Sequence, residues 1–317
     1  MGVAGHRVAT DLDFIAACHK FQKPSLVANH FGIAVRNVHT RMRNLEKKGV
    51  VFFVDDPRSE RKPIDRNPAR LSMKIESGVV IVGSDAHYMP DEVTTAHLAF
   101  VKLCRELKPK AIVMNGDAFD GGSISRWPRI GWENKPTVLM ELEACRLRLG
   151  EIENAAGRTA LIWPLGNHDA RFETRLAAVA PEYEGVRGFT LKEHFPAWKP
   201  CWSFFVNENT VIKHRFKGGI HATHNNAIWA GRSMITGHLH SLKYTPLTDY
   251  NGTRYGVDTG TLSDPDSEAF VDYTEDNPKN WRSGFVVLTY YKGHLLTPEL
   301  CEVTPVGAVF RGQVLAL

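Results

Sequence analysis

Cysteine is scarce in this chain of 317 residues: five copies lie far apart, and no two are spaced Cys-x-x-Cys. This scatter argues against a disulfide framework or a zinc ribbon, so we expect a reducing, cytoplasmic compartment. Long apolar runs are missing too, because no stretch reaches the roughly 18 residues that suggest a transmembrane helix. The first residues lack the apolar segment of a signal peptide and the Ser or Thr that myristoylation requires at position 6. We therefore expect no membrane association.

Positive charge is concentrated at one end of the chain. Residues 1–75 hold 14 Lys and Arg against 7 Asp and Glu, a net charge of +7. The remaining residues hold 25 against 28, a net charge of −3. This asymmetry predicts a small basic module beside a larger, near-neutral one. We place the boundary after residue 73, which gives two domains, 1–73 and 74–317.

The basic module reads as three short helices, over residues 11–20, from Pro24 to Gly32, and over about 35–48. The spacing of Ala28, Gly32 and Val38 resembles a helix-turn-helix, in which a glycine makes the turn between two close helices. Residues 44–56, NLEKKGVVFFVDD, resemble a recognition helix that runs into the wing of a winged helix. Basic wing residues neutralise phosphates, and Arg and Asn side chains can read base edges. The predicted DNA contacts are Arg36, Asn37, Thr40, Arg43, Arg58 and Arg61. The alternative is a protein-interaction module with a basic, solvated face.

From residue 77 onward, apolar runs alternate with helical stretches, a pattern typical of an α/β domain. Five runs end in unusual polar clusters, GVVIVGSDAH (78–87), AIVMNGDAFD (111–120), ALIWPLGNHD (160–169), NTVIKHRF (209–216) and RSMITGHLH (232–240). Buried strands with acids, amides and imidazoles at their carboxyl ends describe the rim of an active site.

The residue types in these clusters indicate metal binding. Asp, Asn and His offer oxygen and nitrogen ligands, and no Cys lies among them, which suits Mn²⁺, Fe or Zn²⁺ better than a thiolate site. Two such ions can clamp a phosphate and activate water for attack on it. The clusters therefore predict a metal-dependent hydrolase of phosphate esters.

The order D-x-H, G-D-x-x-D, G-N-H-D, a later His and G-H-x-H resembles the calcineurin-like metallophosphoesterases over about residues 76–295. The resemblance implies an α/β fold, a two-sheet αββα sandwich flanked by helices, with a dinuclear site at the strand ends. It implies one metal on Asp85, His87 and His240, a second on Asn167, His214 and His238, and Asp117 as the bridge. His168 would protonate the leaving oxygen, oriented by Asp169 or Asp120, and Arg171 or Arg175 would meet the substrate phosphate.

Two features leave alternatives open. In the family, the fourth motif is often His-Gly, but this chain has His214–Arg215, followed closely by His221 and His224. We favour His214 because it directly follows the apolar run. Residues 123–136, SISRWPRIGWENKP, form an insertion near the site that is either a substrate gate or an ordinary surface loop. The aromatic segments 195–205 and 281–291 are interpreted as core and strand rather than as base-stacking platforms.

The functional prediction is a phosphodiesterase or nuclease that processes DNA, delivered to it by the basic module. The alternative is a phosphomonoesterase, acting on protein or nucleotide, with the module as a partner-binding or regulatory element. The arrangement of domains resembles metallophosphoesterases of bacterial viruses and prophages. We expect two divalent ions, with Mn²⁺ preferred over Fe, Zn²⁺ or Mg²⁺, and DNA as the partner. Homodimer formation stays open.

Overall fold

The structure is a computed structural model that describes residues 9–50, 52, 66–128, 130–132, 134–267, 270, 274–275 and 277–317. The chain divides into two compact units, Met1–Asp65 and Arg66–Leu317. Within the described residues, no helix combines the length and the apolar character needed to cross a membrane.

Three helices make up the described part of the first unit, α1 Asp11–Phe21, α2 Pro24–Phe31 and α3 Val35–Glu46. They confirm the three predicted helices. Thr10 begins α1 with a capping box, and Gly32 ends α2 at a φ of +63°, where L side chains are strained. Ala28 and Val38 are buried between the helices, as the helix-turn-helix spacing predicts. The predicted wing, with Arg58 and Arg61, lies outside the described residues.

The second unit begins earlier than the boundary after residue 73. Strand β1, Leu71–Met73, pairs in parallel with β6, Phe204–Val206, and so belongs to a sheet of the larger unit. Ile75 is buried in the same core, and its backbone N–H donates to Asn207 Oδ1 over 2.7 Å. The compact units therefore divide between residues 65 and 66.

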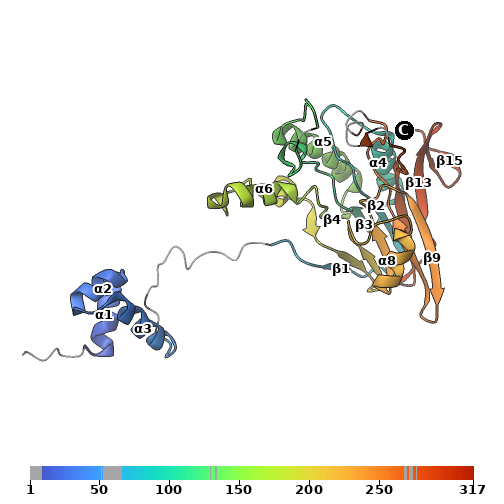
Figure 1. Ribbon diagram of the computed structural model, residues 1–317. Coiled ribbons are helices and arrows are strands. Elements are labelled where there is room, and N and C mark those ends of the chain that lie inside the picture. Colours follow the sequence, from blue (N-terminus) through green and yellow to red (C-terminus); the bar gives the residue numbers. More distant parts are fainter. Residues whose placement is uncertain are drawn as a thin grey trace, which may run out of the picture. The chain divides into compact units, whose positions relative to one another are not determined.

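Two sheets form the second unit (Figure 1). The nine-stranded sheet has the order β15-β14-β13-β11-β2-β3-β4-β5, with β12 beside β11. Its strands are β2 Gly78–Gly83, β3 Ala111–Met114, β4 Ala160–Pro164, β5 Lys199–Cys201, β11 Gly284–Tyr291, β12 His294–Leu295, β13 Glu299–Thr304, β14 Gly307–Phe310 and β15 Gln313–Val314. The six-stranded sheet has the order β1-β6-β7-β8-β10-β9. Its remaining strands are β7 Thr210–Ile212, β8 Ser233–Thr236, β9 Lys243–Asp249 and β10 Gly252–Asp258.

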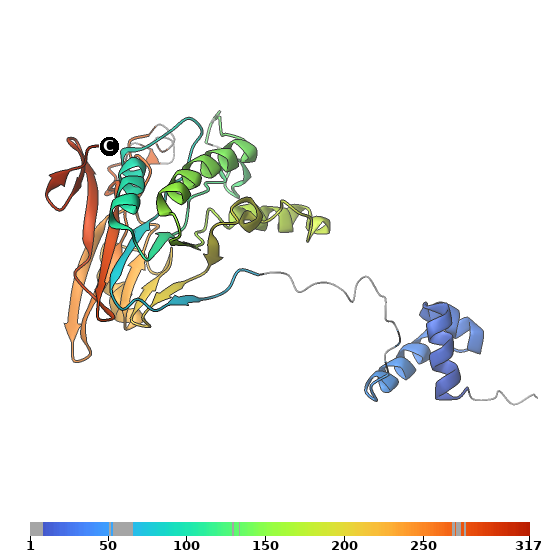
Figure 2. The same cartoon turned by 180° about the vertical axis from the view of Figure 1, so that it is seen from behind.

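Helices cover the outer face of each sheet, as the two opposite views show (Figures 1 and 2). Strand β2 explains the layering, because Val80 and Val82 pack in the core between the sheets while Ile81 packs against the helices. The helices on the nine-stranded sheet are α4 Thr95–Leu107 and α5 Val138–Ala156, and α8 Ala222–Ala230 lies on the six-stranded sheet. Shorter helices are α6 Arg171–Val179, α7 Leu191–His194 and the 3₁₀ turns Gly122–Ile124 and Pro181–Tyr183. The predicted two-sheet αββα sandwich is confirmed.

Parallel pairing brings the polar clusters to one edge. Strands β2, β3 and β4 run parallel as neighbours in one sheet, and β7 and β8 do so in the other. The carboxyl ends of neighbouring parallel strands open at the same edge of a sheet, where active sites of α/β folds lie. The loops after these five strands therefore build the site.

Candidate metal centre

The loops after β2 and β8 bring together a first group of three possible ligands, Asp85, His87 and His240. All three residues are buried, and one ligand atom from each lies within 4.8 Å of the other two. Asp85 Oδ1 is 3.0 Å from His240 Nε2. These are the three residues that the sequence predicts for the first metal.

A second group joins the loops after β3, β7 and β8, and consists of Asp117, His214 and His238. Asp117 Oδ2 lies 3.0 Å from His214 Nε2, which is itself 3.9 Å from Asp85 Oδ1. Asn167, the predicted amide ligand, lines the same groove as His214. Asp117 therefore lies where a carboxylate between the two groups is expected.

The backbone at these ligands is held in an uncommon conformation. Five of the seven predicted ligands have a positive φ, namely Asp85 (+53°), His87 (+42°), Asp117 (+54°), His238 (+74°) and His240 (+55°). Such angles cost free energy in residues other than glycine and persist at functional sites, where the surrounding structure imposes them. The turns direct the ligand side chains into one place at the expense of local stability.

Two glycines in the motifs allow the loops to approach one another. A Cβ on Gly166 would lie 2.0 Å from Asp117 Oδ1, and one on Gly237 would lie 2.6 Å from Asp85 Oδ2. Both distances are far below van der Waals contact. The glycines of G-N-H-D and G-H-x-H are therefore needed for space beside the two buried carboxylates.

Asp120 fixes the orientation of two histidines. Its Oδ1 accepts hydrogen bonds of 2.8 Å from Nδ1 of both His87 and His168. Burial alone would raise the pKa of Asp120, but these imidazoles hold it well below its usual range, so the carboxylate is ionised and only accepts. Each histidine consequently carries a proton on Nδ1, and its Nε2 points away from Asp120. The group His87, Asp120 and His168 is thus explained by hydrogen bonds rather than by a third ion.

The donor set fits divalent cations. Asp85 and Asp117 are fully buried carboxylates, which a protein tolerates when they are paired or coordinate metal. His214 Nδ1 donates to the Asn115 carbonyl over 2.8 Å, so Nε2 is the ring nitrogen that faces the carboxylates. His214 Nε2 and Asn167 Oδ1 are buried, and neither makes a hydrogen bond within the described residues. Imidazole nitrogens and an amide oxygen beside buried carboxylates form a donor set that binds cations such as Mn²⁺, Fe or Zn²⁺.

Burial and neighbouring charges shift the pKa values of the predicted ligand side chains. Burial alone would raise the pKa of Asp85, but His240 and His214 lower it to about 2. Burial alone would lower the pKa of His214, whereas Asp117 and Asp85 raise it to about 10. The two carboxylates therefore stabilise positive charge at His214 Nε2, and a bound cation would supply that charge in place of the His214 proton.

His168 lies beside this centre with Arg171. The His168 backbone N–H donates to Asp117 Oδ1 over 2.8 Å, and its Nε2 is 3.1 Å from Arg171 Nη2. Arg171 Nη1 also donates to the Asp120 carbonyl over 3.0 Å. Burial alone would lower the pKa of His168, but the Asp117 and Asp120 carboxylates raise it overall. The raised pKa would favour a proton on Nε2 once it is released from Arg171, whose guanidinium can only donate.

Asp169 occupies a different place from the orienting one that the sequence allowed for it. Its carboxylate accepts from the backbone N–H groups of Asp117, Ala118, Phe119 and Gly166, at 2.8 to 3.1 Å. It also accepts from Trp163 Nε1 over 3.0 Å. Of the two acids considered, Asp120 contacts the His168 ring. Asp169 instead ties the loop after β3 to the loop after β4.

The alternative histidine ligands and the predicted DNA contacts lie outside the ligand groups. His221 precedes α8 and is exposed, and among the described residues neither His221 nor His224 joins a group of possible ligands. On α3 the predicted DNA contacts Arg36, Asn37, Thr40 and Arg43 are all exposed. The Thr40 hydroxyl donates to the Arg36 carbonyl over 2.9 Å, so it is partly occupied within the helix.

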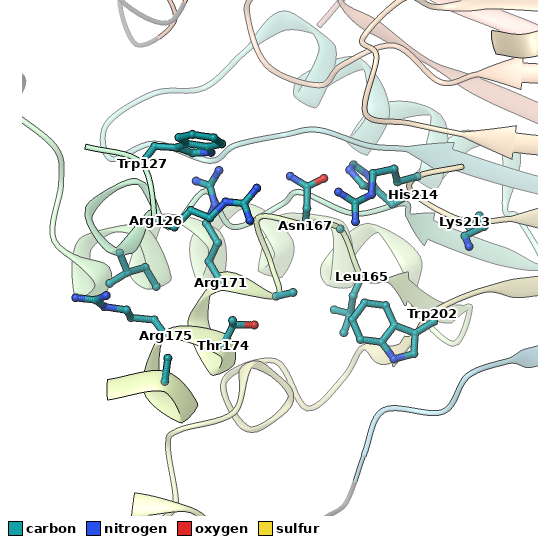
Figure 3. A pocket seen from close by; sticks show the side chains of 15 residues that line it. Arg126, Trp127, Leu165, Asn167, Arg171, Thr174, Arg175, Trp202, Lys213 and His214 are labelled. Carbon is teal, nitrogen blue, oxygen red and sulfur yellow. The ribbon is translucent and has the colours of Figure 1, made fainter. Parts of the chain in front are cut away.

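A groove of about 550 Å³ opens beside the second group of ligands (Figure 3). Its lining includes Asn167 and His214, Arg126 and Trp127 from the insertion 123–136, and three residues to which the sequence gave no role in the site, Trp202, Lys213 and Arg215. Trp202 belongs to the segment interpreted as core, yet 46% of its surface is exposed. Lys213 and Arg215 flank the predicted ligand His214 in the sequence, and this position was the only indication that they lie near the site.

The sequence matches no protein-family model and no curated protein. A single mutant of Vps29 from Entamoeba histolytica is 14% identical, with a TM-score of 0.38, over 73% of this chain and 96% of that one. Wild-type Vps29 from the same organism, complexed with Zn²⁺, is 13% identical, with a TM-score of 0.39 and the same coverage. YfcE, a phosphoesterase from E. coli, is 14% identical, with a TM-score of 0.33, over 69% of this chain and 97% of that one. These similarities concern the fold, and the functional assignment rests on the side chains of this chain.

Proposed function

We propose that the chain is a metal-dependent phosphoester hydrolase of the calcineurin-like type, and specifically a phosphodiesterase or nuclease that acts on DNA. The observation that carries the proposal is the pair of ligand groups, Asp85, His87 and His240 beside Asp117, His214 and His238, in which every side chain but the half-buried His238 is buried. With Asn167, they would hold two divalent ions, and Mn²⁺ is the ion we expect. When bound, such ions clamp a phosphate and activate water as the nucleophile.

The protein's own residues supply orientation and a proton. Asp120 holds the His168 ring through Nδ1, which leaves Nε2 on the side of Asp117 and Arg171, where it would protonate the leaving oxygen. Arg171, which reaches His168 Nε2 in this structure, has the planar guanidinium that binds phosphate oxygens in pairs. Asp169 keeps the loops after β3 and β4 together, so that Asp117 and Asn167 face the same place.

The first unit supports DNA as the substrate. Its net positive charge and the exposed Arg36, Asn37 and Arg43 on α3 suit contacts with phosphates and base edges. Delivery by this unit would compensate for a second unit that carries no net positive charge. The unit would thereby raise the local concentration of DNA at the metal centre.

Turnover of two model substrates tests the proposal. The full-length protein with Mn²⁺ should hydrolyse bis-p-nitrophenyl phosphate faster than p-nitrophenyl phosphate, and EDTA should abolish both activities. Plasmid and single-stranded DNA should then be cleaved under the same conditions. Hydrolysis of the monoester alone would instead indicate a phosphomonoesterase with a partner-binding first unit, and turnover that survives EDTA would overturn the metal-dependent assignment.

A further inference from the structure

The groove beside the metal centre is strongly cationic. Five basic side chains line it, Arg126, Arg171, Arg175, Lys213 and Arg215, and the described part of the chain contributes no acidic residue to the lining. The unit that contains it has more acidic than basic residues beyond position 75, so this concentration of positive charge is local. A surface of one sign in a near-neutral unit raises the local concentration of a ligand of the opposite sign.

These cations are available for a ligand. Among the residues that the structure describes, Arg126, Arg175, Lys213 and Arg215 form no ion pair with a carboxylate. Arg126 lies 5.0 Å from the ring of Trp127, and Lys213 lies 5.7 Å from that of Phe216. By contrast, Arg254, Arg282 and Arg311, which lie outside the groove, pair with carboxylates at 2.6 to 2.7 Å. These four basic side chains can therefore pair with the negative charges of a bound polyanion.

Two tryptophans expose ring surface in the same groove. Trp127 is 67% exposed and Trp202 is 46% exposed. In Figure 3, Asn167 lies between the two indoles, with the guanidinium groups of Arg126 and Arg171 near Trp127. Exposed tryptophan is unfavourable in water unless something covers it, and positive charge interleaved with aromatic rings is how proteins bind single-stranded nucleic acid.

We propose that this groove binds an unpaired, single-stranded stretch of nucleic acid, with its phosphates on the basic side chains and a base stacked on Trp127. A base in a duplex has both faces covered by its neighbours, so only an unpaired strand offers a face to the indole. Because Asn167 and His214 line the groove, a strand in it places a phosphate at the metal centre. This inference rests on the proposed function and adds that the cleaved strand is single-stranded at the site.

The ratio of two specificity constants tests the inference in the full-length protein with Mn²⁺. The substrates are an oligothymidylate of about 15 nucleotides, which has no paired structure, and methyl p-nitrophenyl phosphate, a small diester. Trp127→Ala should lower the ratio of kcat/KM for the oligonucleotide to that for the small diester by about tenfold, within the range for loss of one stacked base. Trp127→Phe keeps an aromatic face and should restore most of the ratio.

The basic side chains give an independent readout. Removing one phosphate contact to a single strand should reduce the slope of log(kcat/KM) against log[salt] by about 0.7. Arg126→Ala and Arg175→Ala should each show this change for the oligonucleotide. Matched controls outside the groove are Trp229→Ala, which removes an indole that is 68% exposed on α8, and Arg105→Ala on α4. Both controls should keep the wild-type ratio and slope, and thermal unfolding should show that every variant is folded.

Failure of the inference differs from failure of the proposed function. If both substrates are hydrolysed but the ratio and slope are unchanged in the groove variants, the groove does not bind the strand and the phosphodiesterase assignment stands. If wild-type protein hydrolyses neither substrate, the proposed function fails. Fluorescence anisotropy of a fluorescein-labelled oligothymidylate in EDTA then measures binding to the groove without hydrolysis. Equal affinity of the wild type and Trp127→Ala for the oligonucleotide would overturn the inference.

Discussion

Asp117 is the side chain on which both ligand groups depend. It lies 3.0 Å from His214 Nε2 and accepts the His168 N–H over 2.8 Å, so its charge and its position serve the two sides of the centre. Asp117→Asn removes one negative charge where two cations require it, and we expect the loss of at least one ion and of diester hydrolysis. Metal content by mass spectrometry and turnover with Mn²⁺ measure both.

Asp91→Asn is the matched control for this variant. Asp91 is exposed and has a φ of +60°, close to the +54° of Asp117, so the control changes the same group on the same kind of backbone. It should leave metal content and turnover as in the wild type. Full occupancy and full activity in Asp117→Asn would refute the placement of the bridge.

His168 is predicted to act on the leaving group without holding a metal. His168→Asn should keep both ions and slow hydrolysis by roughly 10²- to 10⁴-fold, the usual contribution of a general acid. The loss should shrink for diesters with good leaving groups, since these need less protonation. His294→Asn, at an exposed position on β12, should change neither rate nor metal content. A loss of metal in His168→Asn would make the residue a ligand instead.

At the residue scale, the motifs predicted which side chains meet but not which atoms they use. Asp169 and Asp120 look equivalent as orienting acids in the sequence. The structure separates them because Asp169 accepts backbone N–H groups, whose positions no side-chain pattern records. Likewise, Trp202 sits in an aromatic segment that is interpreted as core, yet 46% of its surface is exposed.

At the element scale, Glu141 connects helix α5 to the loop that carries Asp120. Its carboxyl group accepts from the N–H groups of Gly121 and Gly122, at 2.7 and 3.2 Å, and is fully buried. Burial, reinforced by the charge of Asp120, raises the pKa of Glu141 from 4.5 to about 7. The helix therefore holds the loop through a group that is costly to ionise.

This shift has a defined sign in stability. Because the pKa is higher in the folded state, the folded protein binds the extra proton, and the contribution of Glu141 to stability is present below pH 4.5 and is lost as pH rises through 7. The loss amounts to about 3 kcal/mol. Glu141→Gln cannot ionise, so its stability relative to the wild type should rise by about that amount between pH 4 and pH 8. Urea unfolding in EDTA at several pH values measures the difference, and a constant difference would show that Glu141 is not buried as described.

The elements themselves were the most predictable part of the fold. The three helices of the first unit were predicted to within a few residues from apolar spacing, Pro24 and Gly32. Buried strands were found because β2, β3 and β4 are nearly continuous apolar runs. Strand β1 was missed, since three residues that pair with a strand far along the chain carry no local pattern.

At the scale of the whole molecule, we expect catalysis and DNA affinity to separate. A chain that starts at Arg66 keeps β1, the buried Ile75 and every proposed ligand, so it should retain hydrolysis of small diesters. It loses α3 and should lose most affinity for duplex DNA. If the first unit makes about four phosphate contacts, the full-length protein should have a steeper salt dependence by roughly 3–4 in log–log slope.

The unit boundary matters for this comparison. A chain that starts at Ser77 would lose β1 and Ile75, so a loss of activity in it would reflect the fold rather than DNA delivery. Arg36→Ala or Arg43→Ala in the full chain should reproduce part of the loss of affinity. Equal affinities and equal salt slopes for the full-length and shortened chains would reject delivery by the first unit and favour a partner-binding role for it.

The central claim is that the strand ends of both sheets hold two divalent ions. Anomalous scattering from crystals grown with Mn²⁺ tests it most directly. We predict two peaks, one among Asp85, His87 and His240 and the other among Asn167, His214 and His238, with Asp117 between them. A single peak, or peaks away from these side chains, would contradict the assignment of a dinuclear centre.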